Sequence, residues 1–232
     1  MNKSIAAAML AGCFTLLAAC SKQEPPAPAS APTTAQPAPG PAVEANPAVS
    51  AELAARLVRD HSPIMGPAQA PVTVVEFLDP ACEGCAAFSP VVKQIQLLYP
   101  DEVRVVVRFA AFHEGSDQAV RLLVAAHQQQ KFEATLDALF EHQQQWASHH
   151  APDIEQAWQV AGASGLNLAR ARQAARGARA DTVLEVDGED VIALEVARTP
   201  TFFVNGRALS NFGAHELLDL VKQEVAKSSP TG

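Results

Sequence analysis

Cysteine is scarce in this sequence, since 4 cysteines among 232 residues exclude a small domain held together mainly by disulfides. Basic residues are also few, with 17 Lys and Arg against 25 Asp and Glu and a net charge of −8. They form no cluster of the kind that binds a nucleic-acid backbone, so we expect no nucleic-acid partner. Glycine is outnumbered by proline, 12 to 17, and the prolines concentrate near the N-terminus.

The N-terminal apolar stretch, residues 5–19, is too short to cross about 30 Å of hydrocarbon as a helix. It follows Lys3, as in a secretory signal peptide, and ends in Leu-Ala-Ala before Cys20. This ending resembles the lipobox of bacterial lipoproteins, which implies that residues 1–19 are removed and Cys20 is acylated. Ser21 in place of an aspartate favours the outer membrane in that family. The alternative is a plain secretory signal that is cleaved nearby.

Residues 20–49 are predicted to be a tether behind the lipidated cysteine. Eight prolines between residues 25 and 47 alternate with Ala, Ser and Thr, a composition that cannot bury a core and favours polyproline II. At about 3.1 Å per residue the segment reaches at most roughly 90 Å from a membrane. Residues 50–232 are therefore expected to contain the folded domain.

The folded domain is expected to be of the α/β class. A buried strand at 72–78, a helix at 82–98 and a second buried strand at 103–109 predict a right-handed βαβ unit. A helical insertion at about 113–180 separates this half from a ββα half, which has Asn205-Gly206 as its hairpin turn. The remaining helices are predicted near 52–60, 116–130, 132–146, 152–161, 167–178, 181–197 and 214–226, and the remaining strands at 201–204 and 207–209.

Cys82-Glu83-Gly84-Cys85 lies directly after the first buried strand and at the start of a helix. A helix N-terminus offers free N–H groups and a partial positive charge, which stabilise a thiolate on the first cysteine. The second cysteine lies one turn further in, within reach of a mixed disulfide on the first. A Cu(I) or Zn(II) site is the alternative, although a structural zinc site needs further ligands. An inert disulfide would close a short ring and restrain little chain entropy.

Together with Thr199-Pro200 before the later hairpin, this motif resembles the thioredoxin superfamily, and the helical insertion resembles its DsbA-like branch. The resemblance covers residues of about 70–226 and implies a thioredoxin-like fold. It implies a cis peptide before Pro200 that leaves the backbone of Thr199 free to pair with a substrate, against a trans proline on an edge strand. It also implies that Glu76 is the buried acid that relays protons to the second cysteine, against a salt-bridged edge residue.

The motif departs from the strongly oxidising members of that family, which carry Pro-His between their cysteines. Glu83 adds negative charge beside the thiolate, and the motif holds no histidine to offset it, so Glu83 and Gly84 are expected to tune the potential. A less stabilised thiolate makes a weaker oxidant. His113 follows the second strand near the site end of the sheet and is interpreted as a surface-loop residue, with a place lining the cleft as the alternative. The pair His149-His150 is interpreted as part of a surface loop.

These observations predict an extracytoplasmic thiol–disulfide oxidoreductase facing the periplasm. Cys82 is the exchanging sulfur, Cys85 resolves the mixed disulfide, Glu76 transfers protons, and Thr199 with Pro200 positions the substrate. No cofactor and no metal are expected, because the dithiol itself carries two electrons. The expected partners are Cys-containing extracytoplasmic proteins and a membrane redox partner that resets the cysteines, and the protein is expected to be a monomer. The alternatives are a Cu(I)- or Zn(II)-binding module and a non-catalytic binding protein.

Overall fold

Five strands form one mixed sheet in the order β1–β3–β2–β4–β5. The computed structural model describes residues 50–228, so the predicted signal peptide, the tether and the lipidation site at Cys20 lie outside the described residues. The strands are β1 (Ile64–Met65), β2 (Val72–Leu78), β3 (Val103–Phe109), β4 (Thr201–Val204) and β5 (Arg207–Ala208). The predicted bounds of β2, β3 and β4 are confirmed, and β5 ends one residue earlier than predicted.

The two central strands are parallel, with Val72 opposite Val103 and Leu78 opposite Phe109. Both are buried on both faces, which explains their continuous runs of β-branched and aromatic residues. The crossover between them is α2 (Glu83–Leu98), so the predicted βαβ unit is confirmed. The edge strand β1 pairs antiparallel with β3 and was not predicted, because two residues carry no periodic pattern.

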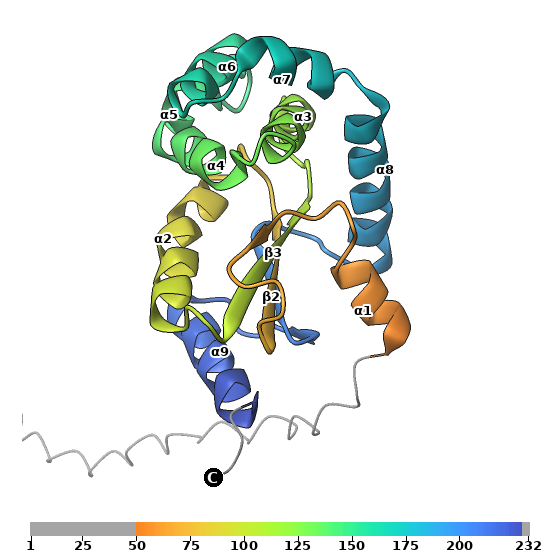
Figure 1. The fold of residues 1–232 in the computed structure, drawn as a ribbon, viewed down its shortest axis with the longest axis vertical. Coiled ribbons are helices and arrows are strands. Elements are labelled where there is room, and N and C mark those ends of the chain that lie inside the picture. The colour runs from red at the N-terminus through yellow and green to blue at the C-terminus, as the bar shows by residue number, and fades with distance from the viewer. Residues whose placement is uncertain (1–49, 229–232) are drawn as a thin grey trace, which may run out of the picture. The chain divides into compact units, whose positions relative to one another are not determined.

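Alternate residues of the central strands point to two separate apolar cores. Helices α2 and α9 (Ala214–Ser228) cover one face of the sheet, where Val74 and Val105 are buried (Figure 1). Helix α8 (Ala178–Ala193) and α1 (Ala51–Leu57) cover the other face (Figure 1). The core on that second face contains Val75, Phe77, Val106, Val191 and Phe203. The fold is thus a helix–sheet–helix sandwich, as expected for the α/β thioredoxin-like class.

The helical insertion lies beyond the carboxyl ends of β2 and β3, at the top of Figure 1. Its helices are α3 (Ser116–His127), α4 (Phe132–Glu141), α5 (Gln143–Trp146), α6 (Ile154–Ala163) and α7 (Leu168–Ala175). The single helix expected at 132–146 is broken at His142, which caps α4 and precedes α5. Within residues 50–228, no helix is both long and apolar enough to cross a bilayer.

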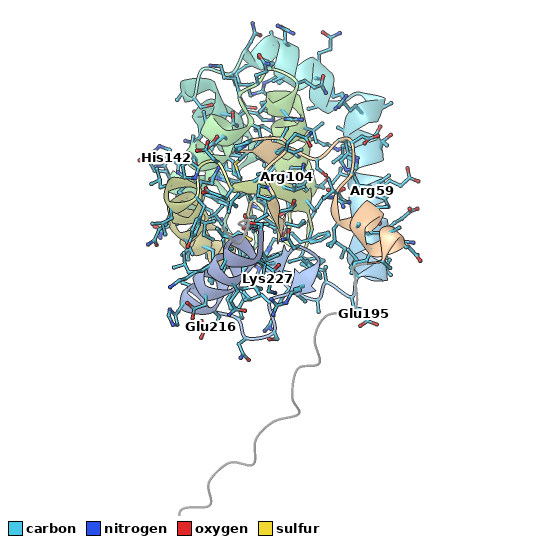
Figure 2. The ribbon with its side chains drawn as sticks, turned by 60° about the horizontal axis from the view of Figure 1, so that its bottom comes forward. Arg59, Arg104, His142, Glu195, Glu216 and Lys227 are labelled. Carbon is cyan, nitrogen blue, oxygen red and sulfur yellow. The ribbon has the colours of Figure 1, made fainter. Side chains whose placement is uncertain are left out.

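A buried cluster of charges ties the α1–α8 face to the sheet. Arg108 on β3 is fully buried, and its Nη2 lies 2.7 Å from both Asp187 Oδ1 and Asp190 Oδ2 on α8. Arg59, which follows α1 and is labelled in Figure 2, adds a second guanidinium 2.8 Å from Asp190 Oδ2. His61 Nε2 lies 2.6 Å from Asp187 Oδ1. Each buried charge therefore has a partner of opposite sign, which offsets the cost of its desolvation.

Candidate active site

The two cysteines of the motif differ in exposure although only two residues separate them. Cys82 is the N-cap of α2 and retains 8% of its exposure, while Cys85 lies in the first turn and is fully buried. The helical insertion fixes the chain just before α2, because Gln143 Nε2 donates to Pro80 O at 2.9 Å and to Cys82 O at 3.0 Å. The helix start therefore presents one sulfur toward solvent and keeps the other inside.

The pKa of Cys82 is lowered to about 5. The hydrogen bond with the Cys85 side chain contributes most, burial opposes it, and hydrogen bonds from Thr199 and from the backbone N–H groups of Cys85 and Gly84 add to the lowering. These last two groups belong to the first turn of α2, whose N–H groups have no partner within the helix. Cys82 is therefore a thiolate at neutral pH, which is the form that attacks a disulfide.

The environment of Cys85 acts in the opposite direction. Burial raises the pKa of this thiol far above its usual value, and the nearby Cys82 and Glu76 add to the effect. Only the backbone N–H of Asp79, 3.4 Å from the sulfur, favours the charged form. Cys85 therefore keeps its proton until a neighbouring base can take it.

The Thr199–Pro200 peptide bond is cis, as predicted. Sγ of Cys82 lies 3.4 Å from the carbonyl oxygen of Thr199, so the loop before β4 lies directly against this sulfur. Gly84 makes this approach possible. A Cβ at its position would lie 3.3 Å from Pro200 Cδ, which is tighter than nine in ten such contacts in proteins, and 3.4 Å from Cys82 Sγ, at the edge of ordinary contact.

Glu76 lies in the central strand β2, opposite Val107 on β3 and Phe202 on β4, so the alternative of an edge position is wrong. Its side chain is 4% exposed and has no ion pair or hydrogen-bond partner among the described residues. Burial, and secondarily the charge of Cys82, raises its pKa to about 8. It lines a cavity of about 20 Å³ that also touches Lys93, room for about one water molecule. Glu76 can thus exchange a proton near neutral pH.

The sequence interpretation of Glu83 is incomplete, because a histidine from outside the motif contacts its carboxylate. His149 Nε2 lies 2.7 Å from Glu83 Oε1, although it comes from the loop after α5 and is itself largely exposed. The sequence showed only the two residues between the cysteines. The fold brings a loop more than sixty positions away to the same carboxylate.

Two further features of the site were not predicted as functional. Asp79 is fully buried, and its carboxylate binds His113, a residue interpreted as part of a surface loop. A cavity of about 370 Å³ beside Pro200 is lined by Phe202, Leu209 and the half-exposed Phe212. Asp79 had a recognisable signal, since it directly follows a buried strand. Phe212 had none, because an isolated aromatic residue after a hairpin carries no pattern.

The two thiols are also potential metal ligands. Within residues 50–228, no group of three or more His, Cys, Asp and Glu side chains has an arrangement that could hold a metal ion. The Cys82 and Cys85 pair has Thr199, Glu76 and backbone groups as its surroundings instead. Cys82 and Cys85 thus form a dithiol beside the proton acceptor Glu76.

The family model described as thioredoxin matches residues 59–223. The chain belongs to the thioredoxin family. A thioredoxin-like oxidoreductase from Silicibacter pomeroyi DSS-3 is 25% identical with a TM-score of 0.63, covering 74% of this chain and 95% of that chain. The α-DsbA1 protein of Wolbachia pipientis shares the fold at 16% identity with a TM-score of 0.65, covering 74% of this chain and 94% of that chain.

A curated relative of this thioredoxin-family chain is a much longer protein. The Na⁺/H⁺ antiporter NhaA 3 of Salinispora tropica is 34% identical over 154 residues, which are 64% of this chain but only 22% of that protein. The chain thus spans about a quarter or less of the curated relatives it matches. The thioredoxin-like fold class is confirmed, and the resemblance to the DsbA-like branch holds at the level of the fold. The predicted enzyme class, a thiol:disulfide oxidoreductase with the direction of electron flow open, agrees with the family and its structural neighbours.

Proposed function

We propose that this chain catalyses thiol–disulfide exchange on Cys-containing proteins outside the cytoplasm, with Cys82 and Cys85 as its redox centre. The observation that carries the proposal is the opposite acidity of the two thiols. The pKa of Cys82 is lowered to about 5 while that of the buried Cys85 is raised, and the cis Thr199–Pro200 bond lies against Cys82. Cys82 is thus the sulfur that exchanges with the substrate, and Cys85 stays protonated until it resolves the mixed disulfide.

In the oxidising direction, a substrate thiolate attacks Sγ of Cys82 in the disulfide form. The bond to Cys85 breaks, a mixed disulfide forms, and Cys85 leaves as a thiolate that takes a proton from Glu76. A second substrate thiolate then attacks the substrate sulfur of the mixed disulfide and expels Cys82 as a stabilised thiolate. The substrate loses two electrons and the dithiol gains two. The same steps in reverse reduce a substrate disulfide.

The substrate chain is proposed to lie along Thr199. Its backbone would pair with the free edge beside the cis peptide, in the manner of a strand added to a sheet. An apolar side chain next to the substrate cysteine would enter the 370 Å³ cavity formed by Phe202, Leu209 and Phe212. This cavity supports a preference for extended, apolar Cys-containing segments.

The test is trapping of the mixed disulfide with an unfolded, Cys-containing protein. Cys85→Ser is expected to accumulate a covalent complex through Cys82, while Cys82→Ser is expected to form none and to lose insulin-reducing activity. Activity that survives Cys82→Ser would contradict the proposal and favour a non-catalytic binding protein. Stoichiometric copper or zinc after purification, without disulfide exchange, would favour the metal-binding module instead.

We also propose that a lipid on Cys20 anchors the chain to a membrane, with the folded domain facing the periplasm. Acylation of Cys20 would attach the chain to a membrane, with the outer membrane favoured by Ser21, and a membrane redox partner would reset the dithiol. Cys20→Ala is expected to abolish incorporation of labelled fatty acid and to release the protein into the soluble fraction. The same chain is expected to sediment as a monomer once detached. Unchanged membrane association of the variant would contradict the anchor.

A further inference from the structure

Asp79, the first residue after β2, connects both active-site cysteines to a histidine. Its carbonyl oxygen accepts the N–H of Cys82 at 3.1 Å, and its own N–H lies 3.4 Å from Cys85 Sγ. Its fully buried carboxylate accepts from Nδ1 of His113 at 2.7 Å and from the His113 N–H at 2.9 Å. One residue therefore sets the position of an imidazole relative to the dithiol.

The carboxylate also fixes which nitrogen of His113 can titrate. Because Nδ1 donates to Asp79, the proton that the ring gains or loses on titration belongs to Nε2. Burial disfavours the charged ring and lowers its pKa. The hydrogen bond and the charge of Asp79 outweigh this effect, and the charges of Cys82 and Glu83 also raise the pKa. The pKa of His113 is therefore raised. Since the attraction between two charges is mutual, a charged His113 must equally favour the Cys82 thiolate.

A second imidazole completes the arrangement around Cys82. The rings of His113 and His149 lie 6.2 Å apart between centroids, and His149 pairs with Glu83 at 2.7 Å. The charged or titratable groups that face His113 are thus Asp79, Cys82, Glu83 and His149. The negative charge that the motif itself carries at Glu83 is partnered, and His113 is left to interact with the thiolate.

We propose that His113, held by Asp79, is the electrostatic partner of the Cys82 thiolate and replaces the histidine that the Cys82–Cys85 motif lacks. The inference rests on the proposed function. In the final step of substrate oxidation, the mixed disulfide breaks and Cys82 leaves with the electron pair. A charged His113 stabilises that leaving thiolate without bonding to it, so the dithiol form gains stability and the protein becomes a stronger oxidant.

The principal test is His113→Asn, which retains a side-chain N–H for Asp79 but cannot become charged. At about pH 6 the equilibrium constant for oxidation of glutathione by the protein is expected to fall about tenfold, and the pKa of Cys82 is expected to rise. At a pH well above the pKa of His113 the two proteins are expected to converge, because the wild-type ring is then neutral and the asparagine of the variant carries no charge at any pH. His215→Asn, the same change on exposed α9, is the matched control and is expected to alter neither quantity.

A second measurement uses the wild-type chain and does not depend on the folding of a variant. NMR titration of His113 is expected to give a higher pKa in the dithiol form than in the disulfide form, because only the former has a thiolate beside the ring. The same pKa in both forms, or a His113→Asn protein with the wild-type glutathione equilibrium at about pH 6, overturns the inference. In either case mixed-disulfide trapping through Cys82 would still test the proposed function separately.

Discussion

At the scale of single residues, the pKa values of Cys82 and Cys85 shift in opposite directions because α2 begins between them. Cys82 caps α2 and receives hydrogen bonds from its first turn, while Cys85 lies inside that turn among apolar groups. Glu76 follows the same logic, since a carboxyl buried in a central strand behaves as a weak acid with a pKa of about 8. The reactivity of the site therefore depends on burial as much as on residue type.

Glu76→Gln tests that burial through the pH dependence of stability. The folded pKa of about 8 lies above the unfolded value of 4.5, so the folded chain holds a proton between these values that the unfolded chain releases. The free energy of unfolding therefore falls as pH rises through this window. Each of the roughly 3.5 pH units between the two pKa values is worth about 1.4 kcal/mol, so the variant is expected to be about 4 to 5 kcal/mol more stable than wild type near about pH 8.5 and within about 1 kcal/mol of it near about pH 5.

Urea unfolding of the reduced proteins at both pH values measures this difference. Glu141→Gln, at an exposed position on α4, is the matched control, and its free energy of unfolding is expected to change with pH as in wild type. If the free energy of unfolding changed with pH equally in wild type and Glu76→Gln, Glu76 would be ionised throughout the range.

Gly84→Ala tests the close approach between the motif and Pro200. The added Cβ would lie 3.3 Å from Pro200 Cδ, so the loop that carries Thr199 must move away from Cys82. We expect the rate of mixed-disulfide formation to fall roughly tenfold, equal to about 1.4 kcal/mol in the barrier. Stopped-flow kinetics with a Cys-containing peptide measure it.

Gly188→Ala on α8 is the control for that substitution, because nothing lies within 4 Å of its added Cβ. Alanine in a helix interior is expected to stabilise this variant by about 0.5–1 kcal/mol and to leave exchange unchanged. A Gly84→Ala protein with the wild-type rate would mean that the Pro200 loop tolerates the displacement.

At the scale of elements, the bounds of the central strands followed from sequence because each is a short apolar run with β-branched residues and clear breakers at both ends. The expected helix at 132–146 is divided at His142 because the chain must turn there to bring Gln143 to Pro80 and Cys82. The helices α1 and α8 are joined to β3 by Arg108, Asp187 and Asp190, whose pairing no local pattern reveals.

Asp190→Asn tests this buried charge cluster. Although burial opposes ionisation, the hydrogen bonds and charges of Arg59 and Arg108 lower the pKa of Asp190 to about 2, below its unfolded value of 3.8. Its contribution to stability is therefore present above about pH 4 and is lost as pH falls through the folded pKa. The variant is expected to lose about 3 kcal/mol near neutral pH, because the buried guanidinium of Arg108 and the partly exposed ones of Arg56 and Arg59 lose a charged partner.

Thermal or urea unfolding against pH gives the result, and the difference from wild type is expected to shrink toward about pH 2. Asp181→Asn on the same helix breaks an exposed pair with Arg121 and is expected to cost under about 1 kcal/mol. Equal losses in the two variants would mean that the cluster contributes no more than a surface pair.

At the scale of the whole molecule, the redox potential reports how well the fold stabilises the dithiol against the disulfide. A Cys82 pKa of about 5 lies between those of thioredoxin, about 7, and DsbA, about 3.5. We therefore expect a potential between about −270 and about −120 mV, that is, a weaker oxidant than members with Pro-His between their cysteines. Equilibration with glutathione, followed by mass spectrometry of alkylated protein, measures it. A value at or above that of DsbA would contradict the expectation.

Short-range patterns of apolar residues, turns and breakers were enough to predict the βαβ and ββα halves and the helix start at the cysteine motif, while the cis peptide before Pro200 was implied by the family resemblance. The electrostatics of Cys82, in contrast, depend on contacts that form only in the folded chain. His149 lies more than sixty positions from the motif and contacts Glu83, and His113, just after β3, contacts Asp79 at the carboxyl end of β2. Charge interacts through space, so the acidity of a thiol depends on neighbours that the local sequence does not contain.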